Sequence, residues 1–211
     1  MPTESICRAL KNKLASRVVG IQNETDYFTA AVVLPLVPQG DDLALLFEVR
    51  SSQLAWQPGE ICFPGGRIEP DDVGPRQAAA RETCEELGLD GRSLEILGPL
   101  DYLVSPIGVI VYPFAGFIAQ PERIRPNPGE VAELFTVPLN YFLTTEPLTA
   151  TMEVATRPVA GFPFDLMPAG YQQDWRRRAT YPVLFYKYGK HVIWGLSARL
   201  LFNFVEVCRL A

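Results

Sequence analysis

The hydrophobic and polar residues fall into blocks that predict strands and helices in one mixed domain. Residues 28–37 form a nearly continuous apolar run, which is typical of a strand buried on both faces. A polar turn at residues 38–42 separates this run from a second expected strand at residues 43–50. Shorter apolar segments predict further strands at residues 61–63, 94–97, 102–104 and 108–118. At the N-terminus, residues 3–17 have apolar positions at helical spacing and predict an amphipathic helix.

A second helix is expected after residue 74, and its two ends are marked in the sequence. Pro75 suits the first helical position, because its missing N–H would have had no partner there. Gly88 suits the end, because glycine adopts the left-handed capping conformation without a Cβ penalty.

Three carboxylates, Glu82, Glu85 and Glu86, are predicted to share one face of this helix. The opposite, mainly apolar face carries Ala80, Thr83, Cys84 and Leu87. Like charges three or four residues apart cost a helix about 0.2–0.5 kcal/mol per pair. A hard divalent cation such as Mg²⁺ or Mn²⁺ would turn that repulsion into a binding site. The alternative is a solvated acidic face, which the glutamates alone do not exclude.

The C-terminal third begins with the least regular segment. Residues 156–180 mix proline, glycine and aromatic residues, and predict a long loop that would cover the substrate. Within it, Arg176–Arg178 is interpreted as a solvated charge cluster, with a phosphate contact as the alternative. A hairpin turning at residues 189–190 and a helix from about Leu196 are expected to follow.

Composition and charge narrow the class of protein. A chain of 211 residues suits one domain with a full core. The net charge of −5 gives no general attraction for nucleic acid or an anionic membrane, so neither is expected as a partner. The single histidine, His191, and four scattered cysteines argue against serine–histidine catalysis and a structural zinc site. With no apolar leader in the sequence, we expect a cytoplasmic enzyme.

The pattern R-E-x-x-E-E-x-G from Arg81 to Gly88, preceded by Gly66 and Asp72, resembles the signature of the Nudix hydrolases. The resemblance implies an α+β Nudix fold, an α/β/α sandwich around a mixed β-sheet. It also implies metal-dependent cleavage of a diphosphate linked to another moiety. Asp72 stands where the family usually has glutamate, eight residues rather than seven separate it from Arg81, and Thr83 replaces an aliphatic residue.

An upstream motif resembles the coenzyme A diphosphatase branch of that family. Arg50, Ser51, Gly59 and residues 63–66 fall on it. A separate segment downstream, Asn-Pro-x-Glu-Val at residues 127–131, also resembles this branch. Two positions depart from the motif: Glu48 stands where threonine is usual, and Ala55 where a basic residue is usual. The implied reaction is hydrolysis of coenzyme A, or of its acyl or oxidised forms, to 3′,5′-adenosine diphosphate and 4′-phosphopantetheine or its derivative.

The resemblance assigns roles within the expected site. Glu82 and Glu86 would bind Mg²⁺ or Mn²⁺, with Glu85 as a third or water-bridged ligand. Arg81 would pair with Asp72 and brace the loop against the helix.

The remaining roles concern the substrate and the attacking water. Arg50, Ser51, Gly65 and Gly66 would contact the substrate, and a carbonyl near the two glycines would add a metal ligand. The general base is left open between Glu85 and Glu130.

Two other functions remain open at this point. One is a Nudix hydrolase of another substrate, such as ADP-ribose or NADH, and the other is a binding module that does not turn over substrate. The expected organisation is a single domain over residues 1–211, with a helical extension at residues 1–27, and a homodimer is left open.

Overall fold

A mixed β-sheet is the centre of the computed structural model, which describes residues 3–209. Strands β3, β2, β1, β7 and β5 lie side by side in that order, and β4, β6 and β8 pair with β1, β7 and β2. β1 runs parallel to β7 and antiparallel to β2 and β4, which makes the sheet mixed as expected. The strands are β1 (Phe28–Gln39), β2 (Asp42–Arg50), β3 (Ile61–Cys62), β4 (Gly65–Arg67), β5 (Glu95–Pro99), β6 (Leu103–Ser105), β7 (Val109–Phe117) and β8 (Val131–Pro138).

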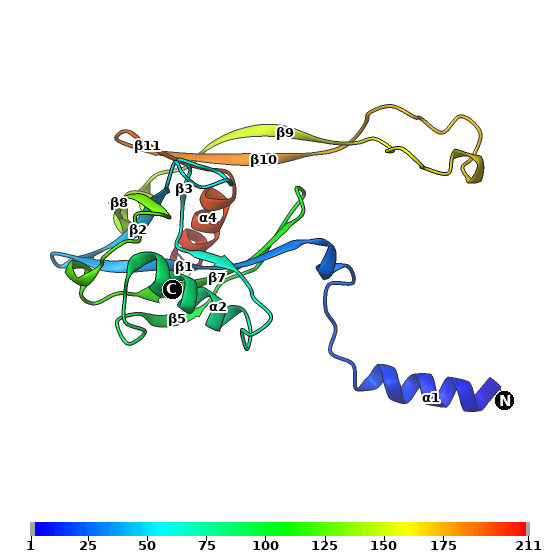
Figure 1. Ribbon diagram of the computed structural model, residues 1–211, viewed down its shortest axis with the longest axis horizontal. Helices are drawn as coiled ribbons and strands as arrows, with labels where there is room; N and C mark the ends of the chain where they lie inside the picture. Colours follow the sequence, from blue (N-terminus) through cyan, green and yellow to red (C-terminus); the bar gives the residue numbers. More distant parts are fainter. Residues whose placement is uncertain (1–2, 210–211) are drawn as a thin grey trace.

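Helices cover both faces of this sheet, which confirms the predicted α/β/α sandwich (Figure 1). Helix α2 (Pro75–Leu87) packs on one face, where Ala31 and Val33 of β1 are fully buried against it. On the other face lie α3 (Leu139–Thr144) and α4 (Gly195–Arg209), which contact Leu34 of β1. Successive β1 side chains point to opposite faces, so an uninterrupted apolar run is what a strand between two layers requires.

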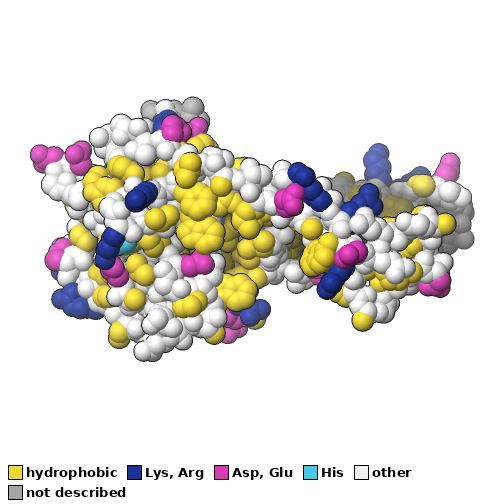
Figure 2. Space-filling view, turned by 90° about the horizontal axis from the view of Figure 1, so that it is seen from above, with side chains coloured by type: hydrophobic (Ala, Val, Ile, Leu, Met, Phe, Trp, Pro, Cys, Tyr) yellow, Lys and Arg dark blue, Asp and Glu magenta, His cyan; other side chains and the backbone are white. Residues whose placement is uncertain are grey.

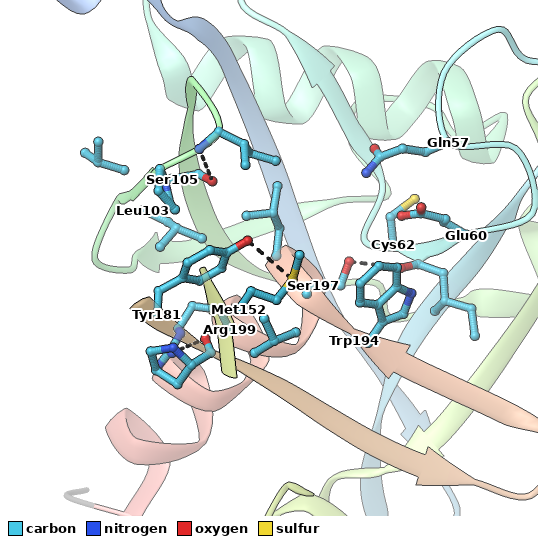
Figure 3. A pocket seen from close by; sticks show the side chains of 18 of the residues that line it. Gln57, Glu60, Cys62, Leu103, Ser105, Met152, Tyr181, Trp194, Ser197 and Arg199 are labelled. Atoms are coloured by element: carbon cyan, nitrogen blue, oxygen red, sulfur yellow. Dashed lines mark hydrogen bonds between the residues drawn. The ribbon is translucent and has the colours of Figure 1, made fainter. Parts of the chain in front are cut away.

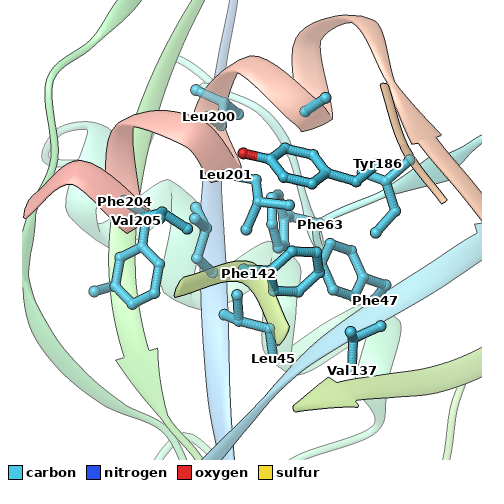
Figure 4. Packing of buried hydrophobic residues seen from close by; sticks show 14 of the residues in the cluster. Leu45, Phe47, Phe63, Val137, Phe142, Tyr186, Leu200, Leu201, Phe204 and Val205 are labelled. Atoms are coloured by element: carbon cyan, nitrogen blue, oxygen red, sulfur yellow. The ribbon is translucent and has the colours of Figure 1, made fainter. Parts of the chain in front are cut away.

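Aromatic side chains fill the core beneath α4 (Figure 4). The rings of Phe47 and Phe63 lie 4.7 Å apart between centroids, and Phe142 meets Tyr186 edge-on at 5.4 Å. Offset and edge-on contacts of this kind are the arrangements that aromatic quadrupoles favour. This core therefore connects β2, which carries Phe47, to the C-terminal part of the chain, which carries Tyr186.

A second sheet, with strand order β11–β10–β9, forms a long arm over the body. Its strands are β9 (Leu148–Thr156), β10 (Arg176–Tyr188) and β11 (His191–Trp194). Only the root of the arm is buried, while its outer part leaves the body toward one side (Figures 1 and 2). Seen from the side of this sheet, hydrophobic side chains gather over the body around the root (Figure 2).

The expectation of a loop over residues 156–180 was wrong at both ends. β9 continues to Thr156, and β10 begins at Arg176, which pairs with Thr156. The connection is therefore residues 157–175, and it extends beyond the body instead of covering a site there (Figure 1). The outer strands have no buried face, so they lack the alternation by which a strand is recognised.

The arginine run Arg176–Arg178 lies on this exposed ribbon, in agreement with a solvated cluster. Arg177 pairs with Glu153 at 2.9 Å, and Arg178 donates to the Thr156 hydroxyl at 2.6 Å. The hairpin at residues 189–190 and the following helix are confirmed.

The N-terminal helix is also present, as α1 (Thr3–Ala15), and none of its residues is buried. Ile6, Leu10 and Leu14 are 45%, 52% and 61% exposed. The placement of residues 1–27 as an extension and of residues 1–211 as one domain stays a prediction. Residues 1, 2, 210 and 211 lie outside the described part. Across residues 3–209, every helix is too short or too polar to cross a membrane.

Candidate active site

Helix α2 is fixed against the sheet by residues at its two ends. Gly74 precedes it and Pro75 occupies its first turn, as predicted. Gly88 ends it with φ 59°, and its N–H donates to the Cys84 carbonyl. A Cβ at this glycine would lie 2.0 Å from the Arg125 carbonyl oxygen, so the end of the helix admits no side chain.

Two glycines let β4 approach the acidic side of α2. The Gly65 N–H donates to Glu86 Oε2 at 2.7 Å, and this glycine has φ 146°. A Cβ on Gly66 would lie 2.5 Å from the carboxyl carbon of Glu82. In the structure Gly65 is bonded to Glu86 and Gly66 lies close to Glu82. The expected contact of both glycines with substrate stays a prediction.

Arg81 connects α2 to the loop before it. Its Nε donates to Asp72 Oδ1 at 3.1 Å and its Nη2 to Oδ2 at 2.9 Å, which is the ion pair that the resemblance implied. Its Nη1 reaches Glu82 at 2.8 Å and Glu85 at 3.3 Å. The bonds from Arg81, followed by a backbone N–H from Glu69, lower the pKa of Asp72. Arg81 therefore braces the loop and neutralises part of the acidic face.

The three helix glutamates differ strongly in exposure. Glu86 is 6% exposed, whereas the Glu85 side chain is 58% exposed and that of Glu82 21%. Burial, then the charge of Glu48, raises the pKa of Glu86 to about 9. Burial also raises the pKa of Glu82, against the opposing effect of Arg81. The glutamates of the expected acidic face therefore range from buried, at Glu86, to largely exposed, at Glu85.

Glu130 reaches the same region from the segment before β8. Its carboxylate accepts a hydrogen bond from Asn127 Nδ2 at 3.1 Å, and its charge raises the pKa of Glu82 and Glu86. The Ser51 N–H donates to its carbonyl at 2.7 Å. Ser51 therefore fixes the backbone of Glu130, and the roles of both residues in substrate binding and catalysis stay predictions.

Arg50 lies at the end of β2, between the acidic residues and a cavity. Its Nε donates to the Trp56 carbonyl at 3.3 Å, and its charge acts on Glu48 and Glu86. This places a guanidinium where the carboxylates end and the cavity begins, as a phosphate contact would require.

The cavity has a volume of about 410 Å³ and is mainly apolar (Figure 3). Tyr181 and Met152 enter it from the arm, with the tyrosine hydroxyl 3.6 Å from the methionine sulfur. Trp194 lines it from β11, and Ser197 of α4 donates to the Ile61 carbonyl at 2.9 Å. Residues that line it include Arg50, Cys62, Leu103, Ile107, Val183 and Arg199. These come from β2, β3, β6 with its turn, the arm and α4, so no single motif could have revealed the cavity.

Two neighbouring residues were given no role by the sequence pattern, and one of them, Cys62, lines the cavity. Glu48 of β2 is 1% exposed, and the Cys62 thiol donates to its Oε1 at 3.1 Å. Burial foremost raises the pKa of Glu48 to about 7 and also raises that of Cys62. The one sequence signal was a glutamate inside the apolar stretch of a strand.

The donor set suits a divalent cation, although the side chains are not closed around one. Within residues 3–209, no group of three or more His, Cys, Asp or Glu is arranged so that it could hold an ion as it stands. Glu82 and Glu85 are paired with Arg81 instead. Carboxylate oxygens are the ligands that Mg²⁺ and Mn²⁺ prefer. Burial foremost raises the pKa of Glu82 and Glu86, and a bound cation would favour their ionised forms. The metal assignment of Glu82, Glu85 and Glu86 stays a prediction.

Comparison with known proteins gives matches across most of the chain. Residues 26–156 match the family model described as the NUDIX domain. The peroxisomal coenzyme A diphosphatase NUDT7 of Mus musculus is 42% identical over 113 residues, which are 54% of this chain and 48% of that protein. The chain therefore spans about half the length of this relative.

Two longer matches extend toward the C-terminus. The mitochondrial coenzyme A diphosphatase NUDT8 of Homo sapiens is 34% identical over 176 residues, covering 81% of this chain and 65% of that one. An uncharacterized Nudix hydrolase, NudL of Photorhabdus laumondii, is 31% identical over 177 residues, covering 84% and 83%. Among solved structures, the Nudix hydrolase RenU of M. smegmatis is 26% identical with a TM-score of 0.46, covering 54% of this chain and 72% of that one.

Proposed function

The chain belongs to the NUDIX domain family, and we propose that it hydrolyses the diphosphate bond of coenzyme A, or of its acyl or oxidised forms. The products would be 3′,5′-adenosine diphosphate and 4′-phosphopantetheine or its derivative. Two relatives, from mouse and human, carry the name coenzyme A diphosphatase, and one of them aligns with 81% of this chain.

The observation that carries the proposal is the apolar cavity that Arg50 lines at the end of β2. Coenzyme A has a diphosphate with a nucleotide on one side and a long pantetheine arm, often acylated, on the other. An apolar cavity of about 410 Å³ lies within the usual size of small-molecule sites and offers an environment for that arm. A nucleoside triphosphate has no comparable group.

The residues of the chain would divide the work as follows. Glu82, Glu86 and Glu85 would hold Mg²⁺ or Mn²⁺, which when bound neutralises phosphate charge and acidifies a water. The Arg50 guanidinium would offer two donors to a phosphate oxygen pair. Through its ion pair with Asp72, Arg81 would hold α2 and the preceding loop in a fixed relative position.

Of the two candidates for the general base, we favour Glu130. Its charge acts on Glu82 and Glu86 from a different segment, and its carboxylate is bound only to the neutral Asn127 amide in the described part of the chain. Glu85, by contrast, is more than half exposed and paired with Arg81. A carboxylate near an activated water can accept its proton.

Product analysis by liquid chromatography tests the proposal. The purified chain would be incubated with coenzyme A, an acyl-coenzyme A, ADP-ribose and NADH, with Mg²⁺ or Mn²⁺ and with a chelator. We expect 3′,5′-adenosine diphosphate from the coenzyme A substrates, and no product with the chelator or with Glu86→Gln. Preferential cleavage of ADP-ribose or NADH would refute the substrate, and turnover that survives the chelator would refute the metal.

Two further expectations remain proposals. The chain was expected in the cytoplasm, whereas the two named relatives are peroxisomal and mitochondrial. A homodimer is proposed as the assembly, and light scattering of the purified chain would measure its mass.

A further inference from the structure

A buried carboxylate in the centre of the sheet has an oxygen without a partner. Glu48 is 1% exposed, and its Oε1 accepts the Cys62 thiol at 3.1 Å. Its Oε2 is buried and has no hydrogen-bond partner among the described residues. Burying a carboxylate in this way is strongly unfavourable unless another charge or an ion compensates it. An unsatisfied group of this kind needs a physical explanation.

The surroundings of Glu48 point to the acidic end of the site. Cys62 lies opposite it in the pairing of β2 with β3. Three residues further along the chain, the Gly65 N–H binds Glu86 Oε2 at 2.7 Å. Glu48 and Glu86 are therefore both hydrogen-bonded to the same short segment, residues 62–65.

The positive charge nearby does not satisfy the free oxygen. Arg50 lies two residues from Glu48 and favours its ionised form, yet its Nε is directed to the Trp56 carbonyl at 3.3 Å. Glu130 adds a further negative charge to the same region. The buried Oε2 of Glu48 therefore stays unpaired although Arg50 lies on the same strand.

We propose that Glu48 is an additional carboxylate of the divalent cation site, supplied by β2 alongside the glutamates of α2. It lies outside the segment from Gly66 to Gly88 that carries the Nudix signature, at a position where the upstream motif usually has threonine. This inference rests on the cation requirement within the proposed function.

A purely structural role for Glu48 leads to opposite expectations. As a neutral acid that only packs against Cys62, its replacement would lower the stability of the metal-free protein and leave cation binding unchanged. As a carboxylate of the cation site, its replacement relieves burial and repulsion in the metal-free protein but weakens binding of the ion. Thermal unfolding and metal titration together separate the two roles.

The test uses the full chain, stripped of metal, with Mn²⁺ as the probe. Free Mn²⁺ would be followed by electron paramagnetic resonance for the wild type, Glu48→Gln and Glu48→Thr. Glu133→Gln is the matched control: Glu133 lies on the neighbouring strand β8, pairs with Lys190 at 2.9 Å, and contacts His191 at 3.0 Å. Melting temperatures would be recorded for each variant with chelator and with Mn²⁺.

We expect the Glu48 variants to bind Mn²⁺ about 10–100-fold more weakly, the range found when groups that support a metal site are lost. Their melting temperatures with chelator should equal or exceed that of the wild type, and the rise on adding Mn²⁺ should shrink. Glu133→Gln should keep wild-type affinity. Equal affinity in wild type and Glu48→Gln would overturn this inference alone, whereas a wild type that binds no Mn²⁺ would overturn the cation requirement as well.

Discussion

Arg81 holds Asp72 with two parallel hydrogen bonds, from Nε at 3.1 Å and Nη2 at 2.9 Å. The same guanidinium reaches Glu82 with its remaining nitrogen at 2.8 Å. Because arginine is planar, this fork sets the angle between the loop and α2 as well as their distance. The position of Glu82 therefore depends on Asp72, ten residues earlier.

Arg81→Lys should reduce turnover about 10–100-fold, the range seen when a group that orients metal ligands is removed. Lysine keeps the charge but cannot make the paired bonds to Asp72. Steady-state kinetics with coenzyme A measures the effect, and circular dichroism should show an intact fold. The control is Asp71→Asn, an exposed neighbour that should behave as wild type. Full activity of Arg81→Lys would mean that the charge alone is sufficient.

Replacing the two glycines of β4 with alanine should affect different properties, namely stability at Gly65 and cation binding at Gly66. A Cβ at Gly65 would lie 2.3 Å from the Ala31 carbonyl, and its φ of 146° is strained for alanine. We expect Gly65→Ala to lower the free energy of unfolding by about 1–3 kcal/mol or more.

At Gly66, the obstacle is the carboxylate of Glu82, which is a side chain and can move. Gly66→Ala should therefore fold normally but bind Mn²⁺ and turn over more weakly. Gly91→Ala is the control, because nothing lies within 4 Å of the added Cβ. Urea denaturation and Mn²⁺ titration distinguish the two sites, and equal stability loss in both would contradict the assignment.

Trp194 should contribute to substrate affinity through the cavity that it lines. Trp194→Ala is expected to raise KM for coenzyme A about 5–30-fold, equivalent to roughly 1–2 kcal/mol of lost contact. Its effect on Mn²⁺ binding should be negligible. Trp175→Ala is a matched control, since Trp175 is 59% exposed and lies on the arm, against Arg157. An unchanged KM for Trp194→Ala would show that the substrate does not bind in this cavity.

Glu130→Gln and Glu85→Gln should separate the candidates for the general base. Loss of the true base is expected to lower kcat by about 10²–10⁴-fold and to remove the acid limb of the pH–rate profile. We expect this for Glu130, while Glu85→Gln should mainly raise the Mn²⁺ requirement. The opposite pattern, with the acid limb lost only in Glu85→Gln, would assign the base to the helix.

The metal-free protein should lose stability as the pH rises. Burial and neighbouring charge raise the pKa of Glu86 from 4.5 to about 9, so its folded form binds a proton more tightly than its unfolded form does. The stability that the folded protein gains from this proton is fully present below pH 4.5 and is lost as the pH rises through about 9. Glu48, with a pKa of about 7, acts in the same direction.

Calorimetry with chelator between pH 5 and 9 would measure this decline in the melting temperature. Glu86→Gln should flatten the profile, because the titrating group is gone. Adding Mn²⁺ should restore stability at high pH, since the cation favours the ionised carboxylates. A wild-type profile that is flat with chelator would show that these carboxylates are better compensated than their burial implies.

The sequence predicted the local features of this site well. Pro75, Gly88 and the spacing of Glu82, Glu85 and Glu86 depend on one helix, and local signals determine a helix and its ends. The ion pair between Arg81 and Asp72 was predicted from the resemblance to the Nudix signature. These residues lie close together in the sequence, so one helix and the loop before it determine their relative positions.

Features that depend on distant segments were missed. The burial of Glu48 against Cys62 depends on the pairing of β2 with β3, which periodicity does not describe. No sequence motif indicated that Trp194 lines a cavity, because the cavity forms where the arm and α4 meet the turn after β6. The outer arm was taken for a loop because its strands bury neither face.

The pairing of β4 with β1 has a wider consequence. Gly65 lies opposite Val32 on the central strand and binds Glu86 through its N–H. The glutamate proposed to bind the cation is thereby attached to the central strand of the main sheet, whereas the arm that shapes the cavity belongs to a separate sheet. Under the proposed function, changes in the arm would alter which compound is accepted without displacing Glu86, so substrate selectivity and bond cleavage would be open to change independently of each other.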